Sequence, residues 1–233
     1  AMRLIRSLLL SAMLALPGLA SGAAVINIVN GNAPGVGFND PTPVAPLPPN
    51  PGTTLGEQRL IAFQYAAQLW GNTLDSVPEI NVLATFEPLT CTAASAVLGS
   101  AGPITVSSDF PGAAYPNTWY HAALANKLAG SVLDPAFPEI RARFNVNLGQ
   151  PGCLTGAFWY LGRDLAAPAG QINLVTVLLH EFGHGLGFSS VTSVSTGALL
   201  AGQSDTYSKF YFDTGLNLFR DQMTDAQRQA SAI

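Results

Sequence analysis

The segment "LLHEFGHGLGFSS", residues 178–190, places two of the chain's three histidines four positions apart, with a glutamate directly after the first. Residues at positions i and i+4 lie on the same face of an α-helix. The imidazoles of His180 and His184 can therefore turn a ring nitrogen toward one metal ion. Glu181 is expected beside that face, where its carboxylate reaches a water on the metal more readily than the metal itself. The spacing predicts a metal site on a helix.

The residues around the histidine pair predict where this helix lies. The stretch "INLVTVLL", residues 172–179, is mostly apolar, so we expect a buried helix over Asn173–Gly185 at the floor of a cleft. Gly183 and Gly185 carry no side chain, which indicates that a neighbouring segment or a substrate comes close. The alternative is a core helix with two hydrogen-bonded histidines, but packing alone does not explain the glutamate between them.

The same pattern suits the hydrolysis of a peptide bond. A zinc ion lowers the pKa of its water to about 7. A carboxylate beside the ion takes the proton as the water attacks a carbonyl, and then passes that proton to the leaving amine. The sequence therefore predicts zinc as the cofactor, Glu181 as the general base and a protein or peptide as the substrate. Hydrolysis of a non-peptide amide would use the same residues, and a zincin fold that serves only as a binding module is the rival interpretation.

The segment resembles the motif of a known class of enzymes. Its two histidines and glutamate match the His-Glu-x-x-His motif of the zincin metallopeptidases, and Gly187 matches the glycine of the metzincin extension His-x-x-Gly-x-x-His. Ser190 stands where that extension has its third histidine. Most of residues 30–233 are also similar to exported bacterial peptidases that share the "LLHEFGHGLGF" helix and often carry a protease-associated domain. The resemblance implies an α+β fold: a zincin-like domain with a mixed sheet and a buried metal-binding helix.

The third protein ligand is not evident from the motif, because Ser190 is a poor ligand for zinc. We expect Asp205, in "GQSDTY", which partly resembles the Gly-Thr-x-x-Asp element of the aspzincins and follows a glycine-rich loop that is able to fold back under the helix. Asp213 is the alternative, although its "FYFDTG" context suits an ordinary turn, and a ligand beyond Ile233 is a third option. His121 lies upstream in a predicted helix, and we interpret it as a surface or core-edge residue.

The N-terminus predicts export. Arg3 and Arg6 precede a short apolar stretch and then a run of small residues, which is typical of a secretory signal peptide over residues 1–23, cleaved between Ala20 and Ala24. The apolar stretch is too short for a membrane anchor, so we expect no stable membrane insertion. The mature protein is expected to be secreted, periplasmic or at the cell surface.

Two cysteines support this compartment. An exported chain with only Cys91 and Cys153 favours one disulfide, which closes a loop of about sixty residues. Binding of a metal by these cysteines is the weaker alternative, because no Cys-x-x-Cys spacing is present.

The composition limits the class of protein. Charged residues make up only 10% of the 233 residues, the formal net charge is −4, and no cluster of lysine and arginine is present, which argues against a nucleic-acid partner. We expect one zincin-like domain over residues 24–233. A helix begins at "TDAQRQASAI", where Thr224 and Gln227 form a capping box, and ends with the sequence, so the domain is expected to continue further. The oligomeric state is not indicated.

Periodicity predicts the remaining elements. They are a strand at Val25–Val29, a helix at 53–74, strands at 78–89 and 102–110, a helix at 117–130, and strands at 138–149 and 156–162. The polar edge of the strand "RARFNVNLG" is a candidate for pairing with an extended peptide substrate. Tyr207 and Tyr211 are candidates to hydrogen-bond the oxyanion, but we interpret "YSKFYF" as ordinary aromatic packing.

Overall fold

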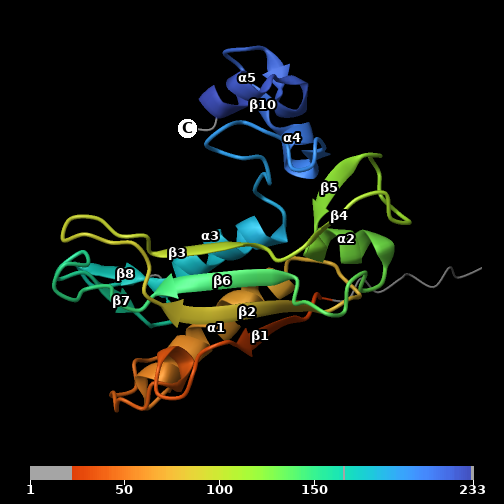
Figure 1. The fold of residues 1–233 in the computed structure, drawn as a ribbon. Coiled ribbons are helices and arrows are strands. Elements are labelled where there is room, and N and C mark those ends of the chain that lie inside the picture. The colour runs from red at the N-terminus through yellow and green to blue at the C-terminus, as the bar shows by residue number, and fades with distance from the viewer. Residues whose placement is uncertain (1–22, 165, 232–233) are drawn as a thin grey trace, which may run out of the picture.

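The computed structural model describes residues 23–164 and 166–231 (Figure 1). The predicted signal peptide lies outside the described residues, apart from its last residue. The predicted α+β fold with a mixed sheet is confirmed. The central sheet has the strand order β1 (Ile26–Asn30), β2 (Ile80–Glu87), β6 (Ile140–Asn145), β3 (Gly99–Pro103). The first three strands run parallel, and β3 runs antiparallel to β6 at the end of the sheet.

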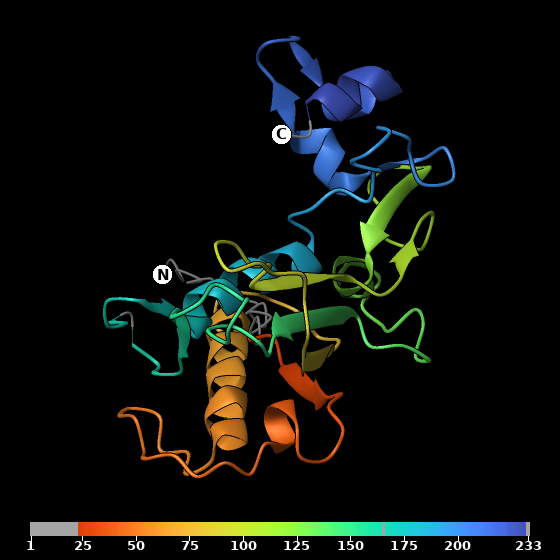
Figure 2. The same cartoon turned by 60° about the vertical axis from the view of Figure 1, so that its left-hand side comes forward.

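Two helices cover one face of this sheet. Helix α1 (Leu55–Gly71) and helix α3 (Leu174–Leu186) lie along this face (Figures 1 and 2). Their buried residues pack against the inward side chains of β2 and β6. The inward positions alternate along the strands as predicted, because successive side chains of a strand point to opposite faces. Phe63 of α1 lies at the centre of an aromatic group, with its ring 5.0 Å from Phe144 and 6.1 Å from Phe182. The opposite face carries the exposed Arg141 and Arg143.

Helix α1 starts where its sequence predicts. The Oγ1 atom of Thr54 accepts a hydrogen bond from the Glu57 backbone N–H, and the Glu57 carboxylate accepts one from the Thr54 backbone. This reciprocal capping box satisfies two of the N–H groups that a helix leaves unpaired at its start. The same device starts α5 (Asp225–Ala230), between Thr224 and Gln227, also as predicted.

The segment 117–130 differs from its prediction as one helix. Its first part is the strand β5 (Thr118–His121), and only the second part is a helix, α2 (Ala122–Ala129), which ends at Gly130 with φ +71°. The aromatic residues of β5 favour a strand. The strand forms because it pairs with β4 (Val106–Ser107) on one side and with β9 (Ser204–Asp205) on the other. The partner β9 is far away in sequence, so the local pattern could not show that pairing.

The remaining elements are short. The predicted strand 102–110 is divided between β3 and β4. The others are η1 (Gly37–Asn39), β7 (Phe158–Tyr160), β8 (Gln171–Asn173), α4 (Thr206–Phe210), β10 (Phe212–Asp213), β11 (Leu218–Phe219) and η2 (Arg220–Gln222). The segment from α4 to α5 stands beyond the C-terminal end of α3 in both views (Figures 1 and 2). In the part of the chain that the structure describes, no helix is both long and apolar enough to cross a membrane.

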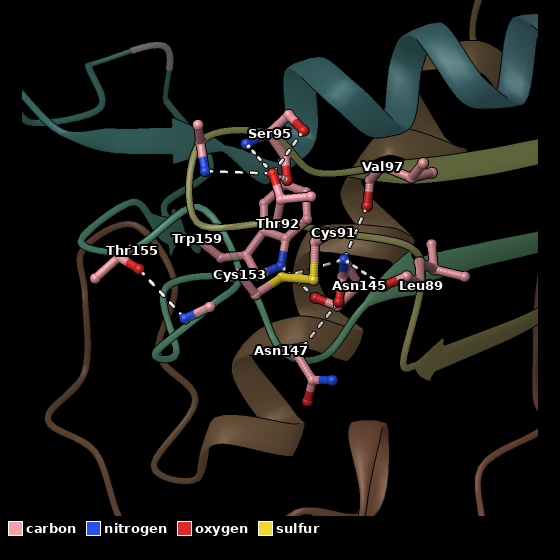
Figure 3. Close-up of a disulfide and its surroundings, with 12 residues drawn as sticks. Leu89, Cys91, Thr92, Ser95, Val97, Asn145, Asn147, Cys153, Thr155 and Trp159 are labelled. Carbon is pink, nitrogen blue, oxygen red and sulfur yellow. Dashed lines mark hydrogen bonds between the residues drawn. A yellow bond between two sulfur atoms is a disulfide. The ribbon is translucent and has the colours of Figure 1, made fainter.

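The predicted disulfide is present. Cys91 and Cys153 are joined, with their Cα atoms 5.0 Å apart, and the bond links the segments that follow β2 and β6 (Figure 3). The buried side chain of Asn145 lies beside it and donates hydrogen bonds to the carbonyls of Leu89 and Val97. A covalent bond and a buried amide therefore hold the loops at this end of the sheet together.

Candidate metal centre

Helix α3 is the buried helix that the sequence predicts. The Asn173 side chain caps its start by accepting a hydrogen bond from the Thr176 N–H at 3.0 Å. Leu174, Leu178 and Phe182 face the core and are fully buried, so the helix is fixed against α1 and the sheet. Both candidate metal-binding histidines lie on the opposite side of this helix, toward solvent.

The two imidazoles converge as the spacing predicts. The Nε2 atoms of His180 and His184 lie 3.0 Å apart, and the two rings are nearly perpendicular. Two nitrogens bound to one tetrahedral zinc at about 2.0–2.1 Å would lie about 3.3 Å apart, so the observed separation suits two ligands of one ion. His180 is exposed and His184 is half-buried, which leaves the point between the two nitrogens open to a metal and to a substrate.

His184 is held in the tautomer that a metal ligand needs. Its Nδ1 atom lies 2.8 Å from the carbonyl oxygen of Phe188. A carbonyl only accepts hydrogen bonds, so Nδ1 carries the proton and Nε2 keeps a lone pair for a metal. Such an outer hydrogen bond fixes the orientation of a metal-binding histidine and raises its basicity. The Phe188 N–H in turn donates to the Gly183 carbonyl at 3.0 Å, which closes the end of the helix.

Glu181 is fixed to the edge of the sheet. Its Oε2 atom accepts a hydrogen bond from the Ala101 N–H of β3 at 2.9 Å, across 80 positions of sequence. The Glu181 side chain is half-buried, so it remains partly accessible to solvent. This bond holds the carboxylate against β3, on the same helix as the two histidines.

The edge that is open for strand pairing is not the predicted one. Strand β6 is paired on both sides, with β2 and with β3, so the prediction that the "RARFNVNLG" strand pairs with a substrate is wrong. Among the described strands of this sheet, the open edge next to α3 is that of β3. In an antiparallel edge strand, every second residue directs its backbone N–H and C=O groups away from the sheet. The Ala101 N–H binds Glu181, so the backbone groups of Ala101, and those of Gly99 and Pro103, point away from β6.

Asp205 does not join the histidine pair. It is fully buried at the start of α4, and its carboxylate accepts hydrogen bonds from Ser190 Oγ at 2.6 Å, from the Val191 N–H at 2.9 Å and from the Ser208 N–H at 2.8 Å. Within residues 23–164 and 166–231, no group of three or more histidine, cysteine, aspartate or glutamate side chains is arranged to hold a metal ion. This arrangement gives no support to Asp205 as the third ligand, because its oxygens already serve three donors.

The other candidates from the C-terminal segment have structural partners. The Asp213 carboxylate accepts hydrogen bonds from the backbone of Gly215 and Leu216, as expected of an aspartate in a turn, and from the Ser231 hydroxyl. These bonds lower the pKa of Asp213. The Tyr211 hydroxyl donates to the Ser231 carbonyl. Tyr207 stacks near Tyr211 and lines a largely apolar cavity of about 720 Å³, which agrees with aromatic packing.

His121 is the residue whose environment the sequence missed. It was predicted at the surface or at the edge of the core, but it is 0% exposed, so that prediction is wrong. Its Nε2 atom lies 2.9 Å from Ser189 Oγ, in the turn directly after α3. Burial lowers the pKa of His121 from 6.5 to about 4, against the opposing attraction of the Asp205 charge, and His184 lowers it further. No local signal marks this role, because it depends on β5 lying against a turn 68 positions away.

Comparisons with protein families, with curated proteins and with solved structures find no match to this chain. Two imidazole nitrogens converge on α3, the same helix carries the Glu181 carboxylate, and the unpaired edge of β3 lies next to that carboxylate.

Proposed function

We propose that the protein is a zinc-dependent endopeptidase of the zincin type that acts outside the cytoplasm. The observation that carries this proposal is the 3.0 Å approach of the His180 and His184 Nε2 atoms on one helix that also bears Glu181. The disulfide supports the compartment, because such bonds persist where the surroundings are oxidising.

His180 and His184 would hold the metal. The His184 Nε2 lone pair is available because the Phe188 carbonyl keeps the proton on Nδ1. Zinc, when bound, lowers the pKa of a water and polarises the carbonyl of the scissile bond. A tetrahedral site has room for a further protein ligand and a water, and no described aspartate or glutamate is arranged to supply that ligand.

Glu181 would move the proton. Its carboxylate accepts a proton from the attacking water and then donates it to the leaving amine, so one group acts as base and as acid. The hydrogen bond from the Ala101 N–H keeps one oxygen of Glu181 at the sheet edge. That bond supports the role, because a general base must be held within hydrogen-bond reach of the proton that it takes.

The open edge of β3 would bind the substrate. An extended peptide that adds to this edge forms backbone hydrogen bonds with the outward groups of Gly99 and with the Ala101 carbonyl, because the Ala101 N–H already binds Glu181. The carbonyl of such a peptide would pass close to Glu181, because the same edge holds that carboxylate. Backbone recognition of this kind suits a peptide more than a small amide, and it favours a peptidase over other amide hydrolases.

Metal content and hydrolysis of a broad peptide panel test the proposal. Wild type should hold about one zinc per chain and cleave peptides. Glu181→Gln should keep the zinc and lose activity by about 10²–10⁴-fold or more, since it removes the base and leaves the histidines. His180→Ala should lose the zinc, because one imidazole fewer holds the ion poorly.

Glu57→Gln is the matched control. Glu57 belongs to the exposed capping box of α1, where glutamine serves as well as glutamate, so this variant should keep full activity. Stoichiometric zinc in His180→Ala would refute the metal site, and unchanged turnover in Glu181→Gln would refute the mechanism.

The second candidate function is a zincin-type binding or surface module without catalysis. The observation that favours it is that, among the described residues, no group of three or more histidine, cysteine, aspartate or glutamate side chains is arranged to hold a metal ion. The same experiment separates the two functions. Zinc-free wild-type protein that cleaves no peptide would support the binding module.

A further inference from the structure

The turn that follows α3, residues 187–191, is held by two buried polar side chains from outside the helix. One is Asp205, at the junction of β9 and α4, and the other is His121, at the end of β5. Both side chains are 0% exposed. Strands β5 and β9 pair with each other, so the two side chains approach the turn from one small sheet.

Asp205 holds the far half of the turn. Its Oδ2 atom accepts from both the Ser190 hydroxyl and the Val191 N–H, while Oδ1 accepts from the Ser208 N–H at the start of α4. Hydrogen bonds to a buried charged acceptor are about twice as strong as neutral ones. The backbone at Ser190 and Val191 therefore has one favoured position relative to β9.

His121 holds the near half of the turn. The Ser189 hydroxyl donates to the His184 carbonyl at 3.1 Å, so its oxygen accepts the hydrogen bond from His121 Nε2. This order of donors places the His121 proton on Nε2. Ser189 is thereby joined both to the last turn of α3 and to β5.

The residue between the helix and these two anchors is Phe188. Its carbonyl oxygen is the acceptor for His184 Nδ1–H, at 2.8 Å. A carbonyl position is set by the peptide plane, and the following residues, Ser189 to Val191, are held at both halves of the turn. A shift of the turn would therefore move the acceptor that fixes the His184 ring.

We propose that Asp205 and His121 are positioning residues for His184, acting through the turn 187–191 and the Phe188 carbonyl. The significance for catalysis rests on the proposed function. The role of these residues in fixing the His184 tautomer does not rest on that function, because their hydrogen bonds to the turn exist in the metal-free protein. Asp205 is thus assigned to the support of a ligand and not to the metal.

The test uses Asp205→Asn with Asp213→Asn as its matched control. Each aspartate accepts hydrogen bonds from backbone N–H groups and from a serine hydroxyl in the same C-terminal segment, but only Asp205 binds the turn. The asparagine amide keeps the size of the side chain but has only one acceptor oxygen, so it cannot accept from the turn and from Ser208 at the same time.

The first readout is the tautomer of His184 in the metal-free protein, from the ¹⁵N chemical shifts of its ring. Wild type and Asp213→Asn should show the Nδ1–H form alone, and Asp205→Asn should show a mixture of both forms. The second readout is zinc affinity, which should fall about 10–100-fold in Asp205→Asn, as is usual for an outer partner of a metal ligand.

Three results would overturn the proposal. A fixed Nδ1–H tautomer in Asp205→Asn would remove the positioning role. Complete loss of zinc with the tautomer unchanged would make Asp205 a ligand. A mixture of tautomers in wild type would show that the turn does not fix the ring. A fixed tautomer in wild-type protein that binds no zinc would instead refute the proposed function and leave the positioning role intact.

Two further variants keep the test decisive if Asp205→Asn does not fold. Ser190→Ala removes one donor to Asp205 and should shift the His184 tautomer in the same direction by a smaller amount. His121→Gln keeps an N–H donor for Ser189 and should preserve the wild-type tautomer, whereas His121→Phe should not. Equal behaviour of the two His121 variants would exclude His121 from the mechanism.

Discussion

The two ends of α3 are held by different forces. Its first two turns are buried through Leu174, Val175 and Leu178, in a core that also contains Phe63 and Phe144. Its last turn leads into a segment held by hydrogen bonds to buried polar side chains on β5 and β9. Apolar burial is non-directional and stabilises the helix as a whole. The hydrogen bonds are directional, and they determine where individual atoms near the histidines lie.

The difference shows how one helix serves two purposes. Substitutions in an apolar core cost little stability if the side-chain volume is kept. Substitutions that leave a buried charge or polar group unpaired cost much more. The precise part of the site therefore lies at the polar end, next to His184. The apolar end fixes the axis of the helix and brings Glu181 to β3.

The largest effect on stability is expected in the core that buries the apolar end of α3, where Phe63 of α1 lies. Phe63→Ala should lower the free energy of unfolding by about 4 kcal/mol, because the residue is fully buried among other rings and leaves a cavity. Phe188→Ala, at the polar end, should change it by less than about 0.5 kcal/mol, since that side chain is 66% exposed. Urea unfolding of the two variants measures their free energies of unfolding. Equal losses of stability would contradict the view that apolar burial holds one end of α3 and hydrogen bonds hold the other.

A similar loss is expected from the disulfide, which joins the segments that follow β2 and β6. Replacing Cys91 and Cys153 with serine should lower the free energy of unfolding by about 4 kcal/mol, because the unfolded chain gains the freedom of a loop of 62 positions. The His184 tautomer in the variant should remain that of wild type, as long as the protein stays folded. A changed tautomer would show that the two regions are coupled.

The smallest of the three effects depends on pH and belongs to the polar end. Buried His121 is neutral in the native protein, with its pKa lowered from 6.5 to about 4, while the unfolded chain binds a proton near pH 6.5. Between these values the unfolded state holds more protons, so stability falls as the pH drops from about 6.5 to about 4 and the loss then levels off. The contribution is about 3 kcal/mol.

His121→Gln isolates this effect, because glutamine does not titrate. The stability difference between wild type and the variant should change by about 3 kcal/mol from pH 7 to pH 4, measured by urea unfolding. The lowered pKa of Asp213 remains in both proteins and cancels in the difference. A difference that does not vary with pH would show that His121 is not buried in its neutral form.

Local sequence was sufficient for the features that depend on neighbours in the chain. The i, i+4 histidine pair, the capping box at Thr224, and the alternation of β2 and β6 are all read within a few positions. Each follows from the geometry of a helix or a strand, and each is present as predicted. The disulfide was also predictable, since the chain has only two cysteines.

Only the tertiary structure decided which groups meet across long stretches of chain. Strand β6 looked like an open edge, and His121 looked like a residue of a surface helix, until their partners were placed. Glu181 meets Ala101 across 80 positions, and His121 meets Ser189 across 68. Such contacts arise from sheet pairing and helix packing. These bring distant residues together, and the sequence around either residue gives no sign of the contact. The sequence by itself therefore determined the chemical groups of the candidate site, and the fold determined what holds each of them in place.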